Sequence, residues 1–188
     1  MTKMDYNTLR FAWTDLETTG TETKGGGILE IASIITDRHF NILESFETLV
    51  YPGEKVLSNI NAFVTDMHTK NGLLKSVRSL GVPNQTEADE KFSEFLSRHN
   101  QGDRTNILLA GNSVAAVDFP FLKEFAPKSK EQLHYRSLDV TSLRISAGIH
   151  FGDDTDFEKS GSHRALDDIR ECIEEFRYVS AQVFKPKK

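Results

Sequence analysis

The chain has 188 residues, a formal net charge of −5 and a single cysteine. A chain of this length can bury its own core, so we expect one domain over residues 1–188 with its core at about residues 11–180. One cysteine excludes both an intramolecular disulfide framework and a zinc site built on several cysteines. The absence of a long apolar run and of a signal or transit pattern, with the lone cysteine, predicts a cytoplasmic protein that has no membrane partner.

The negative charge also limits which nucleic-acid partners are expected. A net charge of −5 argues against a protein that coats long nucleic acid by counterion release. The tail Lys185-Pro186-Lys187-Lys188 is only a small basic patch. If nucleic acid is the substrate, few phosphates are expected to be held.

The first part of the chain is rich in strand-forming residues. Three β-rich stretches separated by glycine-rich or polar turns predict a three-strand meander at residues 11–18, 27–37 and 42–51. The apolar residues of segment 58–80 have no regular spacing, which indicates short helices and loops.

The rest of the chain alternates helices with short strands. The patterns first predict a helix capped by Thr86 and ending near 99–100, followed by a buried strand at 106–110. They next predict a helix at about 119–125, closed by Pro127, and an extended piece at 135–138. The last two elements are a helix capped by Asp139 that ends at about 147 and a helix from about 162 to 184. This mixture predicts an α/β fold with a central mixed β-sheet flanked by helices.

Two acidic residues end the first strand. Asp15 and Glu17 are two residues apart and therefore project from the same face, in line with Phe11 and Trp13. Adjacent carboxylates are tolerated where the site is solvated or where a cation neutralises them, and Mg²⁺ or Mn²⁺ prefers such oxygen ligands. The alternative is a strand end that simply emerges into water.

Asp118 lies just after the buried strand, where strand-to-helix connections of α/β proteins usually form sites. Its alternative role is to cap the next helix. Further along, helix geometry places Asp168 near the apolar stripe of the last helix and Asp167 on the opposite side. Asp168 is therefore the metal-ligand candidate of this helix, although both acids could simply stabilise the helix N-terminus.

His163 precedes Asp168 by about one turn and is flanked by small residues. A histidine side chain ordinarily changes its charge near neutral pH, so His163 could accept a proton from a metal-bound water. A surface or capping histidine is the alternative.

The ordered set Asp15-x-Glu17-Thr18-Thr19-Gly20, Asp118 and His163-x-Ala165-x-x-Asp168 resembles the three motifs of the DEDDh 3′→5′ exonucleases. The resemblance implies an RNase H-like fold and release of nucleoside 5′-monophosphates from 3′ ends. It also implies two divalent cations, Mg²⁺ or Mn²⁺, held by the four acids, with His163 as the general base.

Within that family, residues 11–178 are most similar to the oligoribonucleases, which act on short single-stranded RNA. The similarity is carried by the segments Met67–Leu73, Gly111-Asn112-Ser113, His134–Val140 and Asp167–Glu171. It implies a homodimer in which Tyr135 reaches the neighbouring site. It further implies substrate contacts from Thr18, Thr19, Phe63, His68 and Ser113. Taken alone, Tyr135 could be a half-buried strand aromatic, Phe63 a core residue and Ser113 a loop hydroxyl that satisfies the backbone.

Two departures leave other functions open. Thr18-Thr19-Gly20-Thr21 stands where oligoribonucleases usually have Met-Thr-Gly-Leu, and the spacer from Ser113 to Asp118 is about one residue longer than usual. The first alternative is a broader DEDDh exonuclease that acts on single-stranded DNA or longer RNA, as in proofreading or repair. The second, with less support because all four acids and His163 are present, is an inactive binding module.

Overall fold

The computed structural model describes residues 6–100, 106–152, 157 and 165–184. His163 and the basic tail at 185–188 lie outside the described residues. Among the helices that are described, none is long and apolar enough to cross a bilayer.

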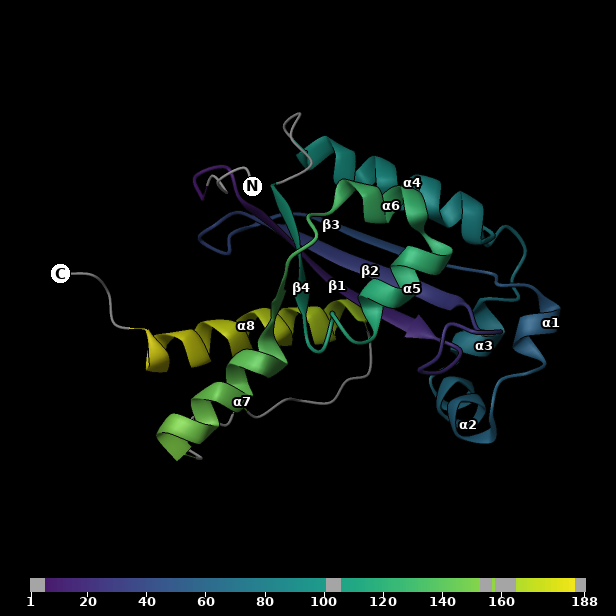
Figure 1. Ribbon diagram of the computed structural model, residues 1–188. Helices are drawn as coiled ribbons and strands as arrows, with labels where there is room; N and C mark the ends of the chain where they lie inside the picture. Colours follow the sequence, from purple (N-terminus) through teal and green to yellow (C-terminus); the bar gives the residue numbers. More distant parts are fainter. Residues whose placement is uncertain (1–5, 101–105, 153–156, 158–164, 185–188) are drawn as a thin grey trace.

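A five-stranded sheet forms the centre of the molecule (Figure 1). Its strand order is β3-β2-β1-β4-β5. The first three strands are antiparallel neighbours, whereas β4 runs parallel to β1 and β5 runs parallel to β4. The prediction of a mixed sheet is confirmed. The strands are β1 (Arg10–Thr18), β2 (Ile28–Thr36), β3 (Ile42–Leu49), β4 (Ile107–Gly111) and β5 (Ser137–Asp139).

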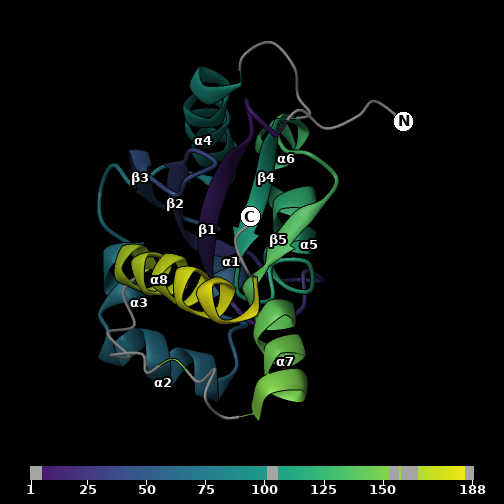
Figure 2. The same ribbon diagram turned by 90° about the vertical axis from the view of Figure 1, so that its left-hand side faces the viewer.

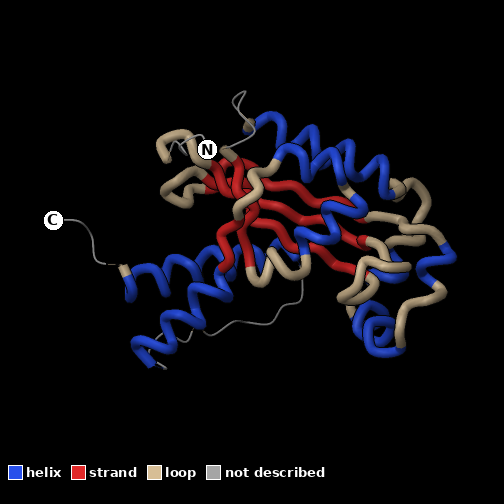
Figure 3. Tube along the Cα trace, in the orientation of Figure 1, coloured by secondary structure: helices blue, strands red, loops and turns tan. Residues whose placement is uncertain are grey.

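Helices cover both faces of this sheet, as Figures 2 and 3 show. One face packs against α4 (Gln85–His99) and α5 (Asp118–Phe125), and α6 (Pro127–Gln132) lies against these two helices. The other face packs against α7 (Val140–Phe151) and α8 (Ala165–Val183). Three short helices lie beyond the C-terminal end of β1 (Figure 1): α1 (Glu54–Leu57), α2 (Ala62–Lys70) and α3 (Leu73–Ser76).

The alternation of side chains along β1 separates the two core layers. Ala12 and Leu16 pack in the layer beneath α4 and α5, whereas Phe11 and Trp13 pack against α8. This is the period of two that a strand buried on both faces requires. The face that carries Phe11 and Trp13 is therefore the face on which Asp15 comes next.

β1 extends past the end of its parallel neighbour. Its pairing with β4 stops at Trp13, opposite Ala110, while its pairing with β2 continues to Thr18. The connection from β4 to α5 turns close to β1 at Gly111, whose φ is +153° and where a Cβ would lie 3.0 Å from the Thr14 carbonyl oxygen. The overhanging end of β1 is thus free to receive groups from this connection.

Three predicted element boundaries were wrong. The helix expected to be capped by Thr86 is capped by Asn84, whose side chain accepts from the Glu87 N–H while Glu87 accepts from the Asn84 N–H. Pro127 opens α6 instead of only closing α5, because proline is tolerated in the first helical turn. Asp139 caps α7 as predicted, but the helix runs to Phe151 rather than ending at about residue 147.

Candidate active site

Asp15 and Asp168 line one pocket of about 280 Å³ between β1, β4 and α8. Asp15 reaches it because it follows Trp13 on the α8-facing side of β1. Asp168 reaches it from the first turns of α8, whereas Asp167 is exposed and pairs with Arg170 on the same helix. Asp168 therefore faces the pocket and Asp167 faces solvent, as helix geometry predicts.

Asp118 is buried where β1 overhangs β4. Its carboxylate accepts a hydrogen bond from the Leu16 N–H at 3.2 Å. Because β4 pairs with β1 only as far as Trp13, β4 offers no partner to this N–H. Burial raises the pKa of Asp118 well above its usual range, and the nearby Asp15 carboxylate raises it further. The alternative role as a helix cap was wrong, since Val117 holds that position and no side chain caps α5.

Asp15 and Asp118 lie close enough for the Asp15 carboxylate to raise the pKa of Asp118. In the part of the chain that is described, no three acidic, histidine or cysteine side chains converge tightly enough to hold an ion as they stand. The chemistry of the donors nevertheless fits a hard divalent cation, because the mutual repulsion of Asp15 and Asp118 is what such an ion offsets. His163, the predicted base, lies outside the described residues.

Glu17 faces α2 at the end of β1, next to His68. The His68 side chain is fully buried; its Nε2–H donates to the Thr18 carbonyl oxygen at 3.1 Å and lies 3.9 Å from Glu17 Oε2. Burial lowers the pKa of His68, so the ring is neutral at pH 7. The hydrogen bond from His68 to Thr18 therefore holds α2 against the end of β1 that carries Glu17.

The two threonines after Glu17 shape the turn that follows. Thr18 Oγ1 donates to the Gly20 carbonyl at 2.7 Å, and Thr19 Oγ1 accepts from the Gly27 N–H at 2.9 Å. Both hydroxyls are engaged within the β1–β2 connection. Any substrate contact from this segment has to share them or use the backbone.

Ser113 adopts a left-handed backbone conformation with φ of 55°, which is uncommon for a residue with a side chain. Its hydroxyl donates to Thr141 Oγ1 at 3.2 Å, and Thr141 in turn donates to Asn112 Oδ1 at 3.4 Å. Ser113 thus bonds a side chain, which differs from the backbone-satisfying role considered for it. Asn112 lines the same pocket as Asp15 and Asp168.

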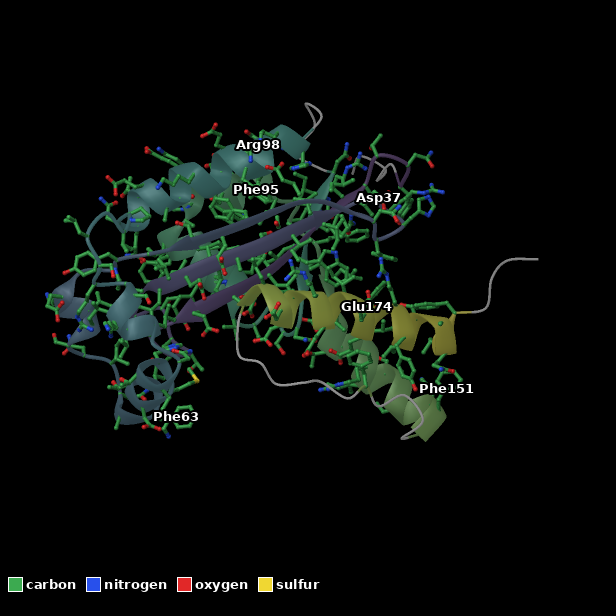
Figure 4. The ribbon with its side chains drawn as sticks, turned by 180° about the vertical axis from the view of Figure 1, so that it is seen from behind. Asp37, Phe63, Phe95, Arg98, Phe151 and Glu174 are labelled. Atoms are coloured by element: carbon green, nitrogen blue, oxygen red, sulfur yellow. The ribbon has the colours of Figure 1, made fainter. Side chains whose placement is uncertain are left out.

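The two candidate aromatic contacts are both exposed. Phe63 projects from α2 with 78% of its surface exposed, at the outer end of the molecule in Figure 4, so it is not a core residue. Tyr135 is 63% exposed and lies just before β5, between the ring of His134 and the guanidinium of Arg136. The alternative of a half-buried strand aromatic was wrong for Tyr135.

Four polar residues at or near the site were given no role from the sequence: Asn112, Thr141, Glu171 and Glu175. Glu175 had a usable signal, since it lies two helical turns after Asp168 and so on the same side of α8. Asn112 belongs to the segment Gly111-Asn112-Ser113 that carried the resemblance, but no pattern gave Asn112 or Thr141 a role of its own.

Comparison with known proteins identifies the family. The RNase T family model, described as exonuclease, matches residues 12–176. An oligoribonuclease of Francisella tularensis subsp. holarctica is 37% identical over 172 residues, which cover 91% of this chain and 94% of that protein. The mouse protein named mitochondrial oligoribonuclease is 35% identical over 95% of this chain and 75% of its own.

Solved structures confirm the fold. Exonuclease I superposes with a TM-score of 0.69 at 14% identity over 92% of this chain. The zinc-bound complex of E. coli exonuclease I with single-stranded DNA gives 0.63 at 16% identity over 93% of this chain. The chain spans only 41% of the length of each of these proteins.

The mixed five-stranded sheet between two helical layers is the RNase H-like architecture predicted from the sequence. Proteins of the matching family are typically metal-dependent. From a family match that spans residues 12–176 and these relatives, the chain belongs to the RNase T exonuclease family.

Proposed function

We propose that this chain is a metal-dependent 3′→5′ exonuclease that releases nucleoside 5′-monophosphates from short oligoribonucleotides. The observation that carries the proposal is the buried Asp118. It lies close enough to Asp15 for the Asp15 carboxylate to raise the pKa of Asp118, and Asp15 shares a pocket with Asp168. The oligoribonucleases at 35–37% identity support RNA as the substrate.

Asp15, Glu17, Asp118 and Asp168 would hold two divalent cations, Mg²⁺ or Mn²⁺. Bound there, the cations would lower the pKa of an attacking water and stabilise charge on the leaving 3′ oxygen. The strand end supplies Asp15 and Glu17, α5 supplies Asp118 and α8 supplies Asp168. We assign the acceptance of the water's proton to His163.

We further propose that substrate is held by residues around this pocket. Ser113 is available at the β4–α5 connection, and the exposed ring of Phe63 offers a stacking surface that tolerates any base. We assign Thr18, Thr19 and His68 to the same substrate-binding region. Because His68 is buried against Thr18 and Glu17, its contact with substrate requires α2 to shift or the histidine to act through these two neighbours.

The chain is proposed to act as a homodimer, with Tyr135 reaching the partner's site. Ile145 and Ile149 are four residues apart on α7 and are both exposed, as is Phe151 at its end. Tyr135 precedes this helix and is also exposed. An apolar helix face next to an exposed aromatic fits a second copy of the chain.

A broader exonuclease, active on single-stranded DNA or longer RNA, is the second candidate. Thr21 favours it, because this exposed polar side chain cannot wedge between bases as an apolar residue would. The cytoplasm remains the proposed compartment, although one relative is named mitochondrial.

The experiment that tests the proposed function is cleavage of 5′-labelled RNA and DNA oligomers of two to about twenty nucleotides, with Mn²⁺, with Mg²⁺ and with chelator. A steep preference for the shortest RNA supports the proposal. Equal cleavage of long or DNA strands favours the second candidate. No metal-dependent cleavage of any strand contradicts both.

A further inference from the structure

Glu175 is a fully buried carboxylate that the proposed reaction does not use. It lies on α8, seven residues after Asp168. At about 100° and 1.5 Å per residue, the two side chains leave the helix within about 20° of each other and about 10 Å apart along its axis. Glu175 therefore lies deeper along the same side of α8 from which Asp168 faces the pocket.

The two oxygens of Glu175 meet groups from two other elements. Oε2 accepts from Asn112 Nδ2 at 3.4 Å, and Oε1 lies 3.5 Å from Nη1 of Arg144 on α7. Burying a carboxylate is costly unless it is paired and hydrogen-bonded. This arrangement joins α8 to α7 and to the β4–α5 connection at one point.

A series of three hydrogen bonds ends at Glu175, and in each of them the donor lies on the side away from Glu175. Ser113 donates to Thr141, Thr141 donates to Asn112, and the Asn112 amide donates to the carboxylate. An ionised carboxylate only accepts hydrogen bonds, so it sets the direction of this series. Ser113 is the first donor of the series, so its O–H can turn to a substrate oxygen at the cost of only its own bond to Thr141.

We propose that Glu175, paired with Arg144, is a positioning residue that holds Asn112 and Ser113 in place for substrate binding. The inference rests on the proposed function, which assigns Ser113 to substrate. Asp15 and Asp118 are held independently by β1 and the Leu16 N–H. Glu175 therefore governs how tightly substrate is bound and leaves the rate of bond cleavage nearly unchanged.

The test measures KM and kcat on a labelled RNA trimer for Glu175→Gln, Arg144→Met and Arg144→Lys. In Glu175→Gln the side-chain amide faces the Arg144 guanidinium, so the attraction between them is lost. We expect this variant and Arg144→Met to raise KM about tenfold, because each removes the ion pair that holds the Glu175 carboxylate, with little change in kcat. Arg144→Lys keeps a cation and should recover most of the loss.

Glu174→Gln is the matched control. Glu174, labelled on α8 in Figure 4, is exposed and pairs only at the surface, with Arg177 on the same helix. Its replacement should leave KM and kcat unchanged. A double variant, Glu175→Gln with Arg144→Met, should raise KM no more than either single change, because both act through one pair.

A second measurement is independent of catalysis: anisotropy of the fluorescently labelled trimer with each variant in chelator. Weaker binding by Glu175→Gln and Arg144→Met supports the inference even if the wild-type protein does not cleave RNA. In that case the proposed function fails and the inference stands. Unchanged KM and binding in folded variants, or a fall in kcat alone, would overturn it. If Glu175→Gln does not fold, Arg144→Met decides by the same criteria, since its side chain is 44% exposed.

Discussion

Asp15 and Asp168 come from different secondary structure elements and meet at one pocket. We expect Asp15→Asn or Asp168→Asn to lower metal-dependent cleavage by at least about a thousandfold, because each removes a ligand charge worth several kcal/mol. Circular dichroism should show an unchanged fold. Normal turnover by either variant would contradict the two-metal site.

Asp118 makes metal-free stability depend on pH. Its pKa is raised in the folded state, so the folded chain retains a proton that the unfolded chain has lost, and stability falls as pH rises above the unfolded value of about 4. In chelator at pH 7 to 8, Asp118→Asn should therefore raise Tm, by about 2–4 °C for each kcal/mol recovered. The gain should shrink as pH falls toward 4.

The control for this experiment is Asp167→Asn, because Asp167 is exposed. Saturating Mn²⁺ should raise the Tm of the wild-type protein more than that of Asp118→Asn. Parallel Tm curves for the wild-type protein and Asp118→Asn across this pH range would show that Asp118 carries no buried charge.

His163 is the proposed base, and its replacement by alanine should slow kcat by roughly 10²–10⁴-fold. Metal binding, followed by the rise in Tm with Mn²⁺, should be largely retained. An undiminished rate would assign the proton to another group.

At the scale of elements, Asp89 ties α4 to α6. Its buried carboxylate accepts from the Lys128 and Ser129 N–H groups and from the Ser129 hydroxyl, and so caps a helix that has no cap of its own. Asp89→Ala leaves these buried donors unpaired and should lower the free energy of unfolding by about 2–4 kcal/mol. Urea denaturation measures the loss.

Glu90 provides the comparison for Asp89. It is the next residue on α4 and forms only a surface pair with Lys128. Glu90→Ala should cost less than about 1 kcal/mol. Equal losses for the two variants would mean that the capping hydrogen bonds contribute nothing beyond surface charge.

At the scale of the whole molecule, the exposed apolar face of α7 is the proposed dimer interface. Ile149 is 75% exposed, and Ile149→Glu should raise the dimer dissociation constant by about 30-fold or more, because a charge would be buried at the interface. Sedimentation velocity reports the change, and activity on the shortest RNA should fall with it. Leu80→Glu, at another exposed apolar residue after α3, should leave assembly unchanged. A monomeric wild-type protein would contradict the interface.

The elements themselves were largely predictable from the sequence. The alternation in β1 identified the face shared by Trp13 and Asp15, and the helical period separated Asp168 from Asp167. Both are local properties, because a strand or helix repeats its side-chain directions within a few residues. Boundaries were less predictable where two capping residues competed, as at Asn84 and Thr86.

The sequence by itself determined the elements, the mixed sheet and the acidic residues of the candidate site. Only the tertiary structure decided which groups those residues meet: Leu16 and Asp118 are 102 positions apart, and Asn112 and Glu175 are 63 apart. Such pairs depend on how far β1 overhangs β4 and how α8 crosses the sheet, and no local period encodes either. The same reason explains why the burial of His68 and the pairing of Glu175 were not predicted.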